Sequence, residues 1–250
     1  MIFINGLRVR VGNEFVNGAK IPDPYNPLDL PPNTVRVRTN DGNAPIKTGG
    51  ASYETATLVT GTTDVYDVYK SGTSFYNLFE NSSNLIEVLG ANTKNVTDMT
   101  SLFHRTSLTK VVLFDTSSVT DMSFMFYGCS LLTSVPLFDT SNVTRIHEMF
   151  DGCSSLTNVP LFDTSNVTDM DWAFKDCTSL TYIPLFDTSK VEQMAYMFFN
   201  CVNVQSGALA LYQQVSTLAT LPIHYYTFYN CGRDTQTGAA ELAQIPSDWK

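Results

Sequence analysis

Carboxylates recur at one fixed spacing through the middle of the chain, and such a pattern can bind a cation. They are 24 residues apart and comprise Asp115, Asp139, Asp163 and Asp187. Stacked copies of the segment would align them as a column of oxygen ligands, the type that Ca²⁺ prefers. The alternative is structural, because an Asp before Thr-Ser accepts hydrogen bonds from its own corner of the backbone. We expect the corner role, and we predict no resident cofactor or metal.

Cysteines follow the same step, as Cys129, Cys153, Cys177 and Cys201. No second Cys or His stands at ligand spacing near them, which argues against a zinc site. Neighbouring units would hold the thiols too far apart for a disulfide, which needs Cα atoms within about 7 Å. We therefore expect buried thiols. A bridge between Cys201 and Cys231 in the last part of the chain is left open.

Catalytic motifs are missing from the sequence. The histidines, His104, His147 and His224, are isolated, and only His147 has an adjacent carboxylate, Glu148. No nucleophile elbow, phosphate-binding glycine loop or zinc-protease motif occurs. We predict that the protein is not an enzyme.

Side chains that vary between units while the surrounding repeat stays constant are the predicted binding residues. Exposed aromatic rings among polar groups suit a carbohydrate or protein partner, because they give a large contact area at low entropic cost. The structural alternative is that these rings pack sideways on the next unit. The candidates are Phe124, Tyr127, Asn158, Trp172, Tyr182, Tyr196 and Phe199.

The elements that must position these residues are four near-identical segments, which begin at Leu113, Leu137, Leu161 and Leu185. A period of this length is typical of a solenoid, in which each unit stacks on its neighbours. The L-x-x-V-x-L pattern that ends at Leu161 predicts a short strand with this leucine facing inward. The spacing of Val143, Ile146, Met149 and Phe150 predicts a short helix. The predicted fold class is an α/β repeat, a leucine-rich-repeat solenoid of short parallel strands and short helices.

Different patterns flank the repeats. The segments FINGLRVRVGNEFV and NTVRVRTNDGNAPI alternate apolar and polar residues around Asn-Gly and Asp-Gly, so each predicts a β-hairpin. The proline-rich stretch IPDPYNPLDLPPN between them predicts an extended connector. We expect a β-rich N-terminal cap or mounting module at 1–64, the solenoid at 65–205 and a helical C-terminal cap at 206–250.

Composition excludes some partners. The net charge of −9 makes a nucleic acid an unsuitable partner. No apolar run approaches 18 residues, so membrane insertion is not expected. The N-terminal residues lack the features of a signal peptide, which favours a virion component or a protein that reaches the extracellular surface by another route.

Whole repeats of the form LFDTSNVTDMSxMFxGCSSLTxVP resemble the BspA-like leucine-rich repeat of bacterial surface proteins, over roughly Leu89 to Cys201. The resemblance implies adhesion and carries over no catalytic residues, and the missing signal favours a bacteriophage-encoded member. We expect a non-enzymatic binding module, such as a tail-fibre tip or decoration protein, that recognises a bacterial or host surface glycan or protein. The alternatives are a bacterial cell-surface adhesin and a structural virion protein that contacts only other virion proteins.

Overall fold

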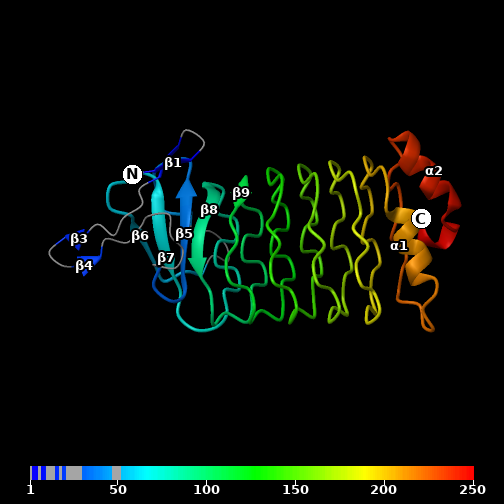
Figure 1. Ribbon diagram of the computed structural model, residues 1–250, viewed down its shortest axis with the longest axis horizontal. Helices are drawn as coiled ribbons and strands as arrows, with labels where there is room; N and C mark the ends of the chain where they lie inside the picture. Colours follow the sequence, from blue (N-terminus) through cyan, green and yellow to red (C-terminus); the bar gives the residue numbers. More distant parts are fainter. Residues whose placement is uncertain (1, 5–6, 10–14, 17–18, 21–29, 47–51) are drawn as a thin grey trace.

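The computed structural model describes residues 2–4, 7–9, 15–16, 19–20, 30–46 and 52–250. A β-sheet lies toward the N-terminal end, a row of stacked turns follows, and two short helices lie at the C-terminal end (Figure 1). No helix in this described part is long and apolar enough to span a membrane.

The sheet is five-stranded and mixed. The central strand β5 lies between β7 and β8, and only the β8–β9 pair is parallel. The bidentate ion pair of Arg36 on β5 with Asp67 on β7, at 2.6 and 2.7 Å, joins two central strands. The strands are β5 (Thr34–Thr39), β6 (Thr55–Leu58), β7 (Val65–Tyr69), β8 (Leu85–Asn92) and β9 (Lys110–Val111).

Two short antiparallel pairs precede this sheet. Strand β1 (Ile2–Ile4) pairs with β2 (Leu7–Val9), and β3 (Phe15–Val16) pairs with β4 (Ala19–Lys20). The hairpin predicted within residues 33–46 is wrong, because β5 pairs with strands much later in the chain. Most of the predicted connector, residues 21–29, lies outside the described residues.

Residues 73–232, which we call the repeat stack, are held together by backbone bonds between successive units. The N–H groups of Glu148, Phe150 and Gly152 donate to carbonyls of the next unit at 2.8–3.0 Å. The N–H groups of Met149 and Asp151 instead donate to the carbonyl three residues earlier, at 3.1 and 3.3 Å. Parallel bridges of one residue mark the register at Ser74, Asp98, Asp121, Arg145, Asp169, Gln193 and Ile223.

The predicted fold class is wrong. Residues 73–205 contain no helix, and the L-x-x-V-x-L segments that end at Leu137, Leu161 and Leu185 form no strands. The chain is instead mostly sheet and turn, with the mixed sheet and two short helices. Each unit has two residues with left-handed backbone four positions apart, such as Trp172 (φ 60°) and Asp176 (φ 56°). Such residues interrupt a right-handed helix, so consecutive tight turns produced the helical spacing seen in the sequence.

The predicted orientation of the repeat leucines is also wrong. Leu161 is 60% exposed, whereas the following Phe162 is 4% exposed. The N–H of Phe162 donates to the carbonyl of Pro160 at 3.0 Å, so the backbone makes a tight turn here. The turn breaks the strand-like alternation and points the phenylalanine inward.

The core consists of columns of like side chains. Phe150 stacks between Phe126 and Phe174, with ring centroids 5.5 and 5.4 Å apart. Beside this column the thiol of Cys153 donates to the carbonyl of Phe126 at 3.0 Å. All five cysteines are buried and free, and Cys201 and Cys231 are therefore not bridged.

The prediction of a helical C-terminal cap is wrong. Within residues 206–250, only α1 (Ala208–Val215) and α2 (Gln236–Gln244) are α-helical, with a 3₁₀ turn at Ser247–Trp249. Between the two helices, residues 223–232 form one more unit of the repeat stack. The division of the chain at residues 64 and 205 stays a prediction.

Candidate functional site

Two columns of left-handed residues run along one side of the repeat stack, and they have different residue types. The inner column holds mostly Gly, Asn and Asp, which adopt this conformation readily. Its members are Asn81, Arg105, Gly128, Gly152, Asp176, Asn200 and Asn230. The outer column has bulky side chains from the third unit on, with φ of 51–60° at Phe124, Glu148, Trp172, Tyr196 and Tyr226. The backbone gives no reason for aromatic residues in this outer column.

Five rings near the C-terminal end of this side contact one another, and we call them the aromatic group. Trp172 stacks on Tyr196 with centroids 4.3 Å apart and planes inclined by 23°. Tyr196 contacts Tyr226 at 5.3 Å, and Phe199 stacks on Tyr229 at 4.8 Å. A ring contact of 5.6 Å between Tyr196 and Phe199 joins the row of Trp172, Tyr196 and Tyr226 to the pair of Phe199 and Tyr229. The structure thus brings together three of the predicted residues.

Phe124 and Tyr127 form a second aromatic cluster nearer the N-terminal end. Their rings are 6.2 Å apart, and the ring of His104 stacks on Tyr127 at 4.7 Å. The guanidinium carbon of Arg105 lies 5.4 Å from the Tyr127 centroid. Glu148 takes the outer-column position between the two clusters.

Asn158 and Tyr182 lie elsewhere. Both are exposed, and they belong to the segment that follows the buried cysteine of each unit. Tyr182, which is 51% exposed, pairs through its backbone with Ser206. No ring contact within the described ranges joins Tyr182 to the aromatic group.

Sequence reasoning missed Tyr226 and Tyr229. Both are exposed, at 46% and 39%, and they occupy the columns of Tyr196 and Phe199. The backbone places them there, because the Tyr196 N–H donates to the Tyr225 carbonyl at 2.8 Å. The signal was the recurrence of FFNC as TFYNC with six extra residues between the copies.

A buried carboxylate lies beside the aromatic group. Asp151 is 5% exposed, and the Nζ of Lys175 is 3.3 Å from both of its oxygens. Burial raises the pKa of Asp151 to about 6, because the attraction of Lys175 compensates only in part. Burial alone would lower the pKa of Lys175, but the bond to Asp176 and the charge of Asp151 raise it. The same ammonium lies 5.2 Å from the Trp172 ring centroid, a cation–π contact.

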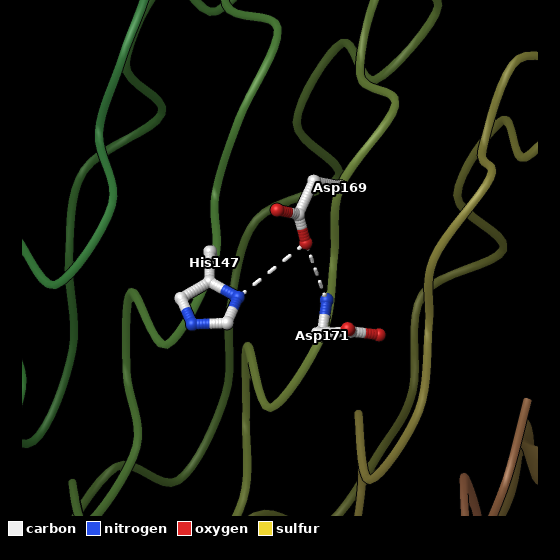
Figure 2. A group of neighbouring side chains, drawn as sticks. All are labelled: His147, Asp169 and Asp171. Atoms are coloured by element: carbon white, nitrogen blue, oxygen red, sulfur yellow. Dashed lines mark hydrogen bonds and ion pairs between the residues drawn. The ribbon is translucent and has the colours of Figure 1, made fainter. Parts of the chain in front are cut away.

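His147, Asp169 and Asp171 converge near the start of this region (Figure 2). The Nδ1 of His147 is 3.5 Å from an oxygen of Asp169, and its Nε2 is 3.0 Å from Glu148. The backbone N–H of Asp171 donates to that same Asp169 oxygen at 3.1 Å. This group was not predicted, because its members come from two different units.

The column of repeat aspartates forms corners. The Oδ1 atom of Asp115 accepts hydrogen bonds from the N–H and hydroxyl of Ser117 at 3.0 and 2.6 Å. The hydrogen bond from the Ser117 hydroxyl lowers the pKa of Asp115 the most, and the bond from the Ser117 N–H lowers it further. The corresponding serine N–H bonds, at 2.8–3.1 Å, are made to Asp139, Asp163 and Asp187. Calcium binding by this column, the alternative to the expected corner role, stays untested.

The search of curated proteins found no match, and the search of solved structures found none. One family model matches, with the description "Mycoplasma protein of unknown function, DUF285". It matches residues 73–180 and 131–218, which together span more than half of the chain. The chain therefore belongs to the DUF285 family, a family of BspA-like surface repeat proteins.

Proposed function

We propose that the protein is a non-enzymatic binding module that recognises a glycan or protein on a cell surface through its aromatic group. The observation that carries this proposal is the contrast between the two left-handed columns. Where only the backbone decides, the chain mostly has Gly, Asn or Asp. In the outer column, it has Phe124, Trp172, Tyr196 and Tyr226. A left-handed non-glycine residue costs about 1–2 kcal/mol, a strain that is typical of functional positions.

The exposure of the group supports the same proposal. Within the group, Tyr226 and Tyr229 are 46% and 39% exposed, whereas Trp172, Tyr196 and Phe199 are half-buried. Tyr225, beside the group, is 64% exposed. A contiguous exposed patch of this kind is typical of an interaction site. The stacking of Trp172 on Tyr196 restrains both rings before a ligand arrives. Binding then costs less side-chain entropy than it would with mobile rings.

The test is the binding of the purified protein to intact bacterial cells, to a glycan array and to surface-protein extracts. We would compare it with Trp172→Asn and Tyr226→Asn, because asparagine tolerates the left-handed backbone and removes the ring without adding strain. Tyr182→Asn is the matched control, since this exposed tyrosine lies outside the group.

We expect the two ring-removing variants to lose at least about tenfold in affinity, as hot-spot aromatic residues do, and the control to bind normally. Retention on the array or in the extract identifies the ligand class. Equal binding by all variants would contradict the assigned site. No binding to any target would favour a structural role against neighbouring proteins. The finer assignment, a bacteriophage virion protein at a fibre tip or in a decoration, stays a prediction.

A further inference from the structure

The ligand atoms of His147, Asp169 and Asp171 lie within 4.8 Å of one another. His147 comes from one unit, and the two aspartates come from the next (Figure 2). The parallel bridge between Arg145 and Asp169 sets the register that brings them together. We propose that these three side chains bind one divalent transition-metal ion, with Zn²⁺ as the expected ion.

The orientation of His147 is the first argument. Its Nε2 lies 3.0 Å from the Glu148 carboxylate, which accepts the Nε2–H in one tautomer of the neutral ring. The lone pair of Nδ1 then faces Asp169 at 3.5 Å, and this Nδ1 atom is buried without a hydrogen-bond partner. Histidines that bind metals typically donate their other N–H to a carboxylate in this way. A metal ion between this lone pair and the carboxylate oxygen would bind both, whereas without a metal a protonated His147 can donate to Asp169 and Glu148.

The two carboxylates are the second argument, because backbone groups hold both in place. Asp169 is 8% exposed, and its Oδ1 atom accepts the N–H of Asp171 at 3.1 Å. An oxygen of Asp171 accepts the N–H of Ala195 from the following unit at 2.6 Å. Asp169 is therefore held in position without a cation, and Asp171 is held nearby. Such positioning by surrounding groups favours metal binding.

Local charge is the third argument. The carboxylates of Asp121, Glu148, Asp169 and Asp171 surround the site, and Arg145 forms ion pairs with two of them, Asp121 and Asp169. Arg145 lies 3.5 Å from the Asp169 oxygen that faces away from His147, and its side chain is 53% exposed. It therefore leaves the ligand atoms accessible and compensates only part of the negative charge. A divalent ion would compensate more.

The ligand types favour zinc over calcium. Tetrahedral zinc with bonds of about 2.0–2.2 Å places its ligand atoms roughly 3.3–3.6 Å apart. The separation of 3.5 Å between His147 and Asp169 fits, and Asp171 must move closer by roughly 1 Å. One imidazole nitrogen with two carboxylate oxygens suits zinc, whereas calcium takes about six to eight oxygen ligands. A water molecule would complete the coordination.

The experiment is calorimetric titration of the chelator-treated full chain with ZnCl₂ at neutral pH, followed by Co²⁺ absorption spectra. We expect one equivalent of Zn²⁺ to bind. Asp169→Asn and His147→Gln should abolish binding. Glu148→Ala, which removes the partner of Nε2, should weaken it by about 10–100-fold. His224→Gln is the control, because this half-buried histidine faces a single carboxylate, Asp248 at 3.5 Å.

Circular dichroism of each variant shows whether it folds, and Glu148→Ala tests the site if a ligand variant does not. Absence of binding heat at a large excess of Zn²⁺ would overturn the proposal. So would stoichiometric binding that is unchanged in a folded Asp169→Asn variant or in Glu148→Ala. The readout is metal affinity alone, so it is independent of whether the aromatic group binds a cell surface.

Discussion

The indole ring of Trp172 stacks on the phenol ring of Tyr196 one unit later, with centroids 4.3 Å apart, and both residues have left-handed backbone. Their stacking compensates part of the strain at two costly positions. Each ring is thus held by a ring of the neighbouring unit. The stacking that compensates the backbone strain therefore requires the two units to be aligned in the repeat stack.

We predict that Trp172 and Tyr196 contribute to stability cooperatively. In a double-mutant cycle with Trp172→Asn and Tyr196→Asn, the coupling free energy should be about 0.5–1.5 kcal/mol, the value typical of an aromatic pair. Urea unfolding measures it. The pair Trp172→Asn and Tyr182→Asn should be additive to within about 0.5 kcal/mol, since these residues share no ring contact. Additivity in the first cycle would mean that the stacking makes no contribution.

We also predict opposite tolerances at two adjacent positions of the repeat. Phe162→Ala removes a ring that is 4% exposed and should lower the free energy of unfolding by about 3–5 kcal/mol. Leu161→Ser changes a side chain that is 60% exposed and should alter it by less than about 0.5 kcal/mol. Chemical denaturation of both variants checks this pair. A larger effect at Leu161 than at Phe162 would contradict the tight turn at Pro160.

The fixed period and the columns of varying residues could be predicted from the sequence, but the local backbone could not. Apolar spacing around Val143 and Met149 fits both a helix and a series of tight turns. Only the left-handed residues distinguish the two, and an aromatic residue such as Trp172 gives no sign of positive φ. Strand β5 looked like half of a hairpin, because its true partners β7 and β8 come much later in the chain.

The candidate site was predictable where it lies within one column. Trp172 and Tyr196 vary at the same position of successive units, and Phe199 lies three residues after Tyr196, so the sequence predicted that they share one side. The group around His147 needs the bonding register between units. That register places His147 and Asp171 in one column and Arg145 and Asp169 in another. The sequence alone showed only Glu148 beside this histidine.

The thiols give a third prediction. The five cysteines are free and buried, and burial raises the pKa of Cys129 to about 11 and that of the others as well. Because the thiolate is the reactive form, the native protein should react very slowly with a disulfide reagent at neutral pH. The denatured protein should release five equivalents at once. A count of three after unfolding without reductant would indicate a bridge, contrary to the structure.

The buried pair of Asp151 and Lys175 gives a prediction about pH. Below about pH 4 the Asp151 carboxyl is protonated in both the folded and the unfolded chain. As the pH rises, the unfolded chain releases this proton first, because burial raises the folded-state pKa to about 6. The contribution of Asp151 to stability therefore falls between about pH 4 and 6 and stays constant above that window.

Asp151→Asn removes this titration and keeps the shape of the side chain. As the pH rises from 4 to 7, the unfolding free energy of the variant should increase relative to that of the unmodified protein. The relative gain across this range should be on the order of 1 kcal/mol after allowance for solvent screening. Lys175→Met should do the reverse, since it leaves a buried carboxylate without its cation and steepens the loss of stability with rising pH. Urea unfolding at a series of pH values measures both slopes. Parallel profiles for all three proteins would show that Asp151 titrates as an ordinary exposed carboxyl.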